Sequence, residues 1–116
     1  MTHDEPTGDH LVLMLAALAN PIRLRIIARL VDGREYVSQL ARDIGISRPL
    51  LHMHLQRLEA AGLVAGSLEL SQEGKAMKYF ELTGFDLHLT PSVLAAAAAT
   101  LTRPGPDQGL TPQENP

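Results

Sequence analysis

Residues 45–64 read GISRPLLHMHLQRLEAAGLV, and this stretch decides the fold. It opens with a glycine, continues without a helix breaker after Pro49, and closes at a second glycine. Successive helical residues are turned by about 100°, so Leu51, Leu55 and Leu58 share one side and form an apolar seam. The opposite side is neither apolar enough for a core nor charged enough for solvation alone. The stretch therefore predicts an amphipathic helix whose outer face contacts something else.

The segment before it predicts a second short helix. Residues 37–44 place Val37, Leu40, Ala41 and Ile44 at the spacing of a single core-facing stripe. Gly45 supplies a left-handed residue to end that helix, and Ser47 is a good cap for the next one. Two short helices joined by so tight a turn form a helix-turn-helix.

In a helix-turn-helix, the start of the second helix meets base edges in the major groove of DNA. Arg48 and Gln56 suit hydrogen bonding to bases, Met53 suits an apolar contact, and the Ser47 end suits a phosphate. His52 and Arg57 flank the same face. The helix taken alone also fits an exposed amphipathic helix with no partner.

The segment after the helix predicts a β-hairpin. Residues 63–71 and 76–83 have partial strand alternation, and Gly74 lies in the connection between them, where a turn needs positive φ. A hairpin directly after a recognition helix is a wing, and Lys75 and Lys78 near its tip suit phosphates or the minor groove. The alternative is a plain hairpin that covers the core.

Helix-capping and helix-breaking residues predict three further helices and two irregular ends. Asn20 and Pro21 separate helices over residues 9–19 and 21–31, both apolar on more than one face, and Thr90 and Pro91 begin the last helix. We expect a flexible segment over residues 1–8, one domain over residues 9–103, and a disordered proline-rich tail over residues 104–116.

Composition limits the class of protein. The 116 residues include no cysteine, and the net charge is −3. All ten basic residues lie within residues 9–103 against nine acidic ones, so the body is close to neutral. The polar N-terminus is no signal peptide and the apolar runs are short, which favours a soluble cytoplasmic protein without a membrane span. The sequence has no glycine-rich phosphate loop or nucleophile elbow, so we do not expect an enzyme.

Four segments together resemble one family. LANPIRLRIIARL, YVSQLARDIGIS, SRPLLHMHLQRLEAAGLV and EGKAMKYFEL, in this order, are similar to the winged helix-turn-helix of ArsR/SmtB-type bacterial transcription regulators. The resemblance implies a mainly α fold of four helices, a small β-hairpin and a fifth helix. It also implies a homodimer formed by the first and last helices, with one recognition helix for each half-site of a double-stranded DNA operator. The full set of expected DNA contacts is Gln39, Ser47, Arg48, Pro49, His52, Met53, Gln56, Arg57, Lys75 and Lys78.

The last helix fits the implied dimer, because small side chains allow close approach. Its apolar face is formed by Val93, Leu94, Ala97, Ala98 and Leu101. The alternative is that this helix packs on its own subunit.

The sequence departs from the family at the sensor. The usual cysteine pair corresponds to Tyr36 and Ser38, which offer no thiolate. The usual carboxylates and histidines of the last helix are replaced mostly by alanine.

The histidines of the sequence support one hypothesis about a metal site. His52 and His54 lie about 200° apart on a helix and cannot share an ion. His3, Asp4 and His10 suit nickel or zinc, and could meet Asp86 or His88 across a dimer. Terminal histidines are also commonly just solvated.

These observations lead to one function and one alternative. We expect a dimeric, sequence-specific DNA-binding transcription regulator that needs no cofactor. A metal response without cysteine and a protein co-regulator are hypotheses attached to it. The alternative is a winged-helix module that acts through contact with a partner subunit.

Overall fold

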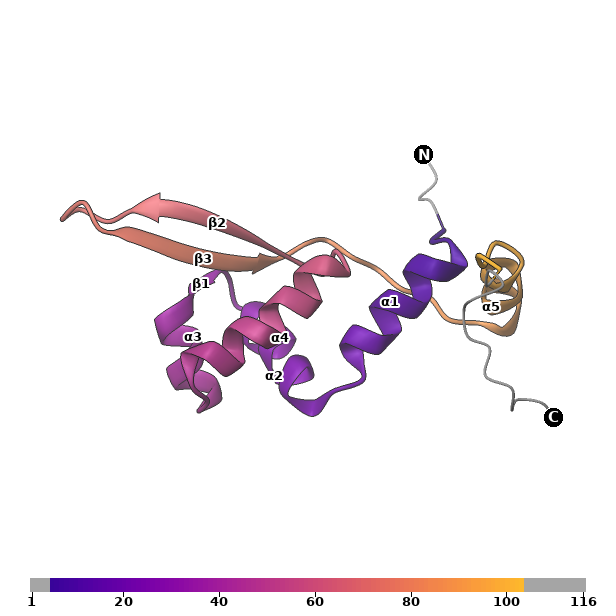
Figure 1. Ribbon diagram of the computed structural model, residues 1–116, viewed down its shortest axis with the longest axis horizontal. Helices are drawn as coiled ribbons and strands as arrows, with labels where there is room; N and C mark the ends of the chain where they lie inside the picture. The colour runs from indigo at the N-terminus through magenta and orange to yellow at the C-terminus, as the bar shows by residue number, and fades with distance from the viewer. Residues whose placement is uncertain (1–4, 104–116) are drawn as a thin grey trace. The chain divides into compact units, whose positions relative to one another are not determined.

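The computed structural model describes residues 5–103, with the elements labelled in Figure 1. They are α1 (Gly8–Leu18), α2 (Pro21–Leu30), β1 (Glu35–Tyr36), α3 (Val37–Ile44), α4 (Arg48–Ala60), β2 (Val64–Leu70), β3 (Ala76–Leu82) and α5 (Pro91–Ala98). The predicted order of five helices and a hairpin is confirmed, and a short first strand is added to it. Residues 1–4 and the predicted tail over residues 104–116 lie outside the described residues.

The described chain forms two compact units. Residues 12–87 form the larger unit, and residues 5–11 form the smaller unit together with residues 88–103. The prediction of a single domain over residues 9–103 stays a prediction.

The predicted helix caps are present in the structure. The side chain of Asn20 accepts hydrogen bonds from the backbone N–H groups of Ile22 at 2.9 Å and Arg23 at 3.1 Å. Gly45 has φ of 83° and ends α3, and the Ser47 hydroxyl then accepts from the Leu50 N–H at 3.3 Å. These two residues fix the tight turn between α3 and α4, because each satisfies a requirement of a helix end.

The core of the larger unit is aliphatic. Its largest fully buried side chains are Ile26, Leu40, Leu51, Leu55, Leu58, Leu63 and Val64. They come from α2, α3, α4 and the entrance to β2, and β3 adds Phe80. The leucine seam of α4 therefore faces inward, as its spacing predicts, and the outer face of α4 is left for other contacts.

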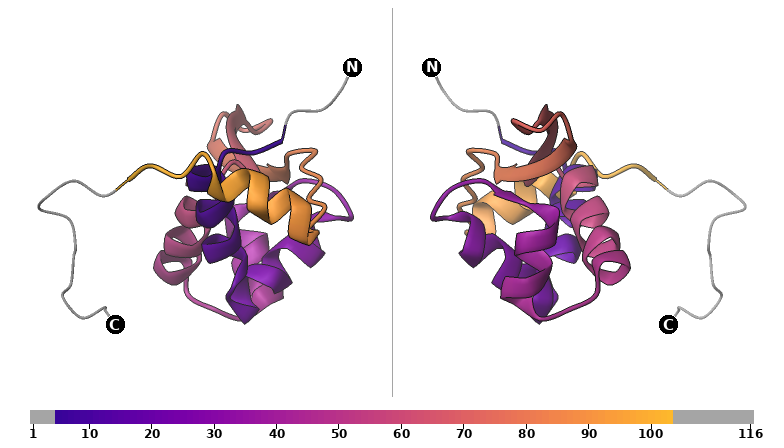
Figure 2. Two further views of the ribbon diagram at one scale, coloured as in Figure 1. Left: turned by 90° about the vertical axis from the view of Figure 1, so that its right-hand side faces the viewer. Right: turned by 90° about the vertical axis from the view of Figure 1, so that its left-hand side faces the viewer.

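The sheet is antiparallel with strand order β1-β3-β2. Its hairpin pairs Val64 with Leu82 at one end and Leu70 with Ala76 at the other, and Gly74 in the turn has φ of 83°. The two residues of β1 pair with Tyr79 and Phe80 of β3. Two residues are too few to show an alternating pattern, so sequence periodicity does not indicate β1. Helices α2, α3 and α4 lie together beneath this hairpin (Figure 2).

The smaller unit joins the start of α1 to the end of α5. The Gly8 N–H donates to the Thr100 hydroxyl at 2.7 Å. The Asp9 carboxylate accepts from the Thr102 backbone N–H at 3.2 Å and from the Thr102 hydroxyl. A β-carbon on Gly8 would lie 2.3 Å from the Ala97 carbonyl oxygen. Glycine is therefore required here by close approach.

No single helix within residues 5–103 has the length and hydropathy to cross a membrane. Helices α1 and α2 reach them only as a pair, with a bend of 93° between them.

Candidate nucleic-acid interface

A hollow with basic residues lies between the start of α4 and the hairpin in the larger unit. Its volume is about 800 Å³. We call it the basic groove; it is lined by Tyr36, Val37, Ser38, Arg48, Pro49, His52, Lys75, Ala76, Met77 and Lys78. Five expected DNA contacts are among these residues, three from α4 and two lysines from the hairpin region. No lining residue is acidic, so the groove presents a field that attracts anions.

A second hollow continues this surface around the turn between α3 and α4. It has a volume of about 600 Å³ and shares Ser38 and Arg48 with the basic groove. Ser47 and Arg42 also line it. This hollow lies at the start of α4, and a helix N-terminus favours negative charge.

Gln39 lines neither hollow. Its amide donates to Asp43 at 2.9 Å, and its carbonyl accepts from Arg42 at 2.7 Å. Asp43 also accepts from Arg29 at 2.7 Å, and Arg29 bonds Glu35 at 2.8 Å. Hydrogen bonding by Gln39, followed by that of Arg29, lowers the pKa of Asp43. Gln39 thus belongs to a polar network on the surface of α2 and α3.

The hairpin is joined to the segment around β1 by residues that sequence reasoning missed. Arg34 donates twice to the Glu69 carboxylate, once at 3.0 Å, and its guanidinium lies 4.3 Å from the centre of the Tyr79 ring. Tyr79 meets Tyr36 edge to face at 5.7 Å. The hydrogen bond from Arg34 lowers the pKa of Glu69. Because these contacts depend on strand register, no local pattern in the sequence indicates them.

Gly66 on β2 makes room for Lys78. A β-carbon on Gly66 would lie 2.8 Å from Cε of Lys78 and 3.0 Å from the Phe80 ring. The Lys78 ammonium lies 5.6 Å from the centre of that ring. The stem of Lys78 therefore packs across β3 and β2, which limits the directions that its charge can take.

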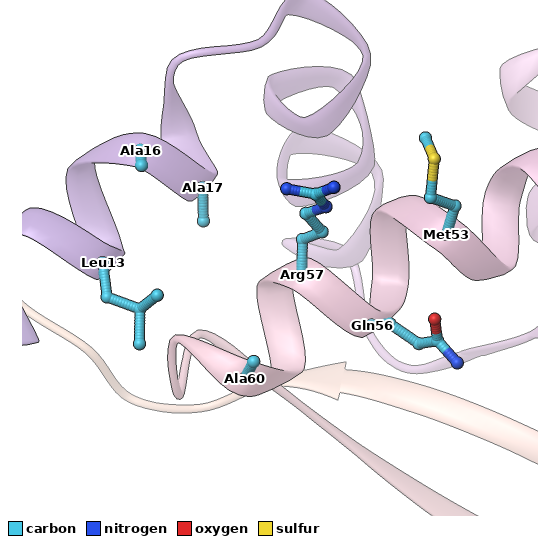
Figure 3. Close-up of a pocket in the computed structure, with 7 residues that line it drawn as sticks. All are labelled: Leu13, Ala16, Ala17, Met53, Gln56, Arg57 and Ala60. Carbon is cyan, nitrogen blue, oxygen red and sulfur yellow. The ribbon is translucent and has the colours of Figure 1, made fainter. Parts of the chain in front are cut away.

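Three other expected contacts on α4 line a separate hollow. Met53, Gln56 and Arg57 line a pocket of about 400 Å³, called here the α1–α4 pocket, with Leu13, Ala16, Ala17 and Ala60. Figure 3 shows the Arg57 guanidinium between the two helices, while the Gln56 amide points away from α1. The structure thus divides the expected recognition face into two parts.

A buried pair lies behind α4. Arg23 Nη1 lies 3.0 Å from His54 Nδ1, and Arg23 Nε donates to the Ala17 carbonyl at 2.7 Å. Arg23 is 8% and His54 4% exposed. A guanidinium only donates, so Nδ1 accepts and His54 is neutral. Burial, then the charges of Arg23 and Arg57, lower the pKa of His54.

The histidines do not gather around one point in the described chain. His52 lines the basic groove, whereas His54 bonds Arg23 in the interior. Within residues 5–103, no group of three or more His, Cys, Asp or Glu residues is placed to hold a metal ion. His3 and Asp4 lie outside the described residues, and His10 is in the smaller unit, where its backbone N–H donates to Thr7. Tyr36 and Ser38, in place of the family's cysteine pair, line the basic groove and do not fit a thiolate metal site.

Comparison with known proteins gives consistent matches. The family model described as "Bacterial regulatory protein, arsR family" matches residues 20–65. An uncharacterized HTH-type transcriptional regulator of Methanocaldococcus jannaschii, MJ0229, is 31% identical over 83 residues, which cover 72% of this chain and 86% of that protein. The repressor SmtB of Mycobacterium tuberculosis is 35% identical over 73% of this chain and 58% of its own length. The regulator CmtR of that species is 40% identical over 54% of this chain, and the match spans half of CmtR.

Solved structures share the fold. A homodimeric winged helix-turn-helix DNA-binding domain of Mycobacterium bovis, described as a possible ArsR-family transcriptional regulator, has a TM-score of 0.59 at 26% identity. That match covers 78% of this chain and 74% of the other. HlyU of Vibrio cholerae has a TM-score of 0.56 at 26% identity, covering 79% of this chain and 88% of HlyU.

Proposed function

Because the chain belongs to the ArsR family of bacterial regulatory proteins, which are DNA-binding transcription regulators and not enzymes, we propose that it binds a near-palindromic operator as a homodimer. Each protomer presents its basic groove to one half-site. The protein works in the cytoplasm, where operator DNA lies, alone or with a protein co-regulator.

The observation that carries this proposal is the composition of the basic groove. Arg48 and His52 on α4 face the same hollow as Lys75 and Lys78 of the hairpin region, with no carboxylate among the lining residues. A duplex that receives the start of α4 in its major groove would meet the hairpin at the adjacent backbone. Arg48 then reads bases, while the lysines neutralise phosphates.

Gln56 extends the reading face along α4. It is exposed, and its amide points away from α1 (Figure 3). We propose that Arg48 and Gln56 together set sequence preference, with Pro49, His52 and Met53 in apolar or van der Waals contact with bases. Ser47 and the N-terminus of α4 hold a phosphate. Arg57 and Gln39 belong to the same set of expected DNA contacts, but they lie outside the basic groove.

The dimer is supported by exposed apolar side chains on α1 and near α5. Val12 is 57% exposed on α1, and Leu94 is 43% and Leu101 44% exposed in the smaller unit. Apolar side chains of this size at helix surfaces suit burial against a second copy. The homodimeric state of the Mycobacterium bovis domain is consistent with this assignment.

The test is DNA binding at several salt concentrations. Operator fragments are selected from sheared genomic DNA, and affinity is measured by fluorescence anisotropy. Arg48→Ala and Gln56→Ala should each reduce discrimination between operator and unrelated DNA by about 1–3 kcal/mol. Lys75→Ala should weaken both DNAs alike and lower the salt dependence. Arg25→Ala is the control, because exposed Arg25 lines none of the three hollows. Unchanged discrimination in both of the first variants contradicts the proposed reading face.

A second candidate function is a winged-helix module that contacts a partner subunit. The hairpin favours it with two exposed apolar side chains, Leu68 at 67% and Leu70 at 75%. The same titrations separate the two functions, because release of counterions makes DNA binding fall steeply with salt, whereas an apolar protein contact does not weaken in this way.

Metal response is a separate hypothesis. We propose His3, Asp4 and His10 as ligands for nickel or zinc, because these residue types suit both ions. Isothermal titration with each metal compares the natural protein with a His3→Ala/His10→Ala variant. Weaker binding by the variant is the expected result, and equal binding removes these ligands.

A further inference from the structure

The α1–α4 pocket has the size and lining of a small-molecule site. Its volume of about 400 Å³ lies within the usual range for ligand sites of about 300–1,000 Å³. One side is made of Leu13, Ala16 and Ala17 on α1, and the other is made of residues of α4. Small alanine side chains leave space between the helices, and Met53 gives a flexible apolar wall. Such a pocket suits an apolar group of modest size.

The charged group in this pocket is a cation. The Arg57 guanidinium stands between the two helices beside Ala17 (Figure 3). Among residues 5–103, Arg57 forms no ion pair with a carboxylate, in contrast to Arg29 and Arg34. A guanidinium offers two parallel N–H donors that match a carboxylate.

A second unneutralised cation lies behind the same part of α4. Arg23 is buried, and its described partners are the neutral His54 ring and the Ala17 carbonyl, with no carboxylate. Ala17 lines the α1–α4 pocket, so Arg23 is hydrogen-bonded to a residue of the pocket wall. Burial first, and then the charges of Arg23 and Arg57, lower the pKa of His54. A buried positive charge favours a nearby anion.

We propose that the α1–α4 pocket binds a small amphipathic organic anion, whose carboxylate pairs with Arg57 and whose apolar part lies against Leu13, Ala16 and Met53. The ligand contacts the recognition helix at Met53 and Arg57, next to the α4 residues that line the basic groove. Binding of the ligand in the pocket therefore changes the position of α4, and through it the affinity of the protein for DNA. This second step rests on the proposed function, whereas ligand binding itself does not.

The first experiment measures binding in the absence of DNA. Sodium octanoate and sodium phenylacetate are titrated into the full chain, and saturation is followed by calorimetry and by NMR shifts. We expect saturable binding, with octan-1-ol and octylamine at least tenfold weaker than octanoate because they cannot pair with a guanidinium. The absence of saturable binding by both carboxylates overturns the proposal.

Matched variants locate the site. Arg57→Gln removes one exposed positive charge from the pocket, and Arg25→Gln removes one elsewhere. We expect at least tenfold weaker octanoate binding for Arg57→Gln and unchanged binding for Arg25→Gln, because a charge-assisted hydrogen bond is lost only in the first. Ala16→Leu fills the pocket and should also weaken binding. Equal binding by the natural protein and Arg57→Gln overturns the assignment.

Three further measurements accompany these variants. Circular dichroism and urea unfolding check that each variant is folded. Sedimentation of Ala16→Leu tests whether a second copy of the chain covers this face; dissociation of a dimer without octanoate binding to the natural protein would mean that the partner copy occupies it, which overturns the proposal. Operator titration with and without octanoate then tests the coupling. Octanoate binding without any change in DNA affinity contradicts the coupling and leaves the proposed operator binding intact.

Discussion

Replacement of Gly8 by alanine tests the contact between the start of α1 and the end of α5. The new β-carbon would lie 2.3 Å from the Ala97 carbonyl oxygen and 2.7 Å from Leu101. The Leu101 side chain can rotate away, but Ala97 is helical backbone and cannot. The segments must separate by more than 0.5 Å to reach even the tightest ordinary contact, and the Gly8 N–H to Thr100 hydrogen bond of 2.7 Å would stretch.

Three effects set the size of the change. Overpacking of this kind costs about 1–3 kcal/mol, and weakening of one hydrogen bond adds about 1 kcal/mol. Alanine gains up to about 1 kcal/mol over glycine inside a helix, but less at the first helical residue. Overpacking therefore prevails, and we expect a net loss of about 1–3 kcal/mol.

The assay is urea unfolding of Gly8→Ala beside Gly84→Ala. A β-carbon on Gly84 meets no atom within 4 Å, so that variant reports the general effect of replacing glycine. Amide exchange of residue 8 should also accelerate in Gly8→Ala, because the opening is local. A Gly8→Ala protein as stable as the natural one, with unchanged exchange, would refute the close approach.

Three other predictions concern the larger unit. The pKa of His54 is lowered in the folded state, so the folded protein binds fewer protons than the unfolded chain; the contribution to stability is present above the unfolded pKa of about 6.5 and is lost as pH falls through the folded pKa. The urea midpoints at pH 7.5 and 5.5 should therefore differ more in the natural protein than in His54→Gln. If the two proteins show the same difference between these pH values, His54 is not held neutral beside Arg23. Leu58→Ala should cost about 2–5 kcal/mol in urea unfolding, because Leu58 is fully buried; a loss below about 1 kcal/mol is incompatible with that packing. Arg34→Gln should leave thermal unfolding nearly unchanged, because its ion pair with Glu69 is exposed to solvent; a marked fall in the unfolding temperature would show that the pair is coupled to the core.

The helices and the turn between α3 and α4 were predictable because local chemistry determines them. Asn20, Gly45 and Ser47 each act within four residues of their own position, and a leucine seam needs only helical spacing. The ArsR resemblance is confirmed by the family and structural matches. The predicted ends of the other helices and strands agree with the observed ones or differ by one residue, where hydrogen bonding frays. The last helix was expected to include Leu101, but α5 ends at Ala98.

The rest depends on contacts between residues far apart in the chain. Arg23 meets His54 across 31 positions, and Arg34 meets Glu69 across 35. From the neighbouring sequence alone, an arginine within α2 is expected to be exposed. Its burial needs partners that only the fold supplies. The division of the α4 face between the basic groove and the α1–α4 pocket has the same origin, since it is set by where the hairpin and α1 lie.

The buried Arg23 links the parts of the larger unit that the proposals use. It lies on α2, bonds the carbonyl of Ala17 on α1, and bonds His54 on α4. Removal of any one partner would leave a buried charge with an unmet hydrogen bond, which is costly, so the positions of the three helices are coupled through Arg23. A ligand that draws α1 and α4 together at Arg57 would therefore also shift α2. The start of α4 would follow, and Arg48 and His52 in the basic groove would take a different position toward DNA.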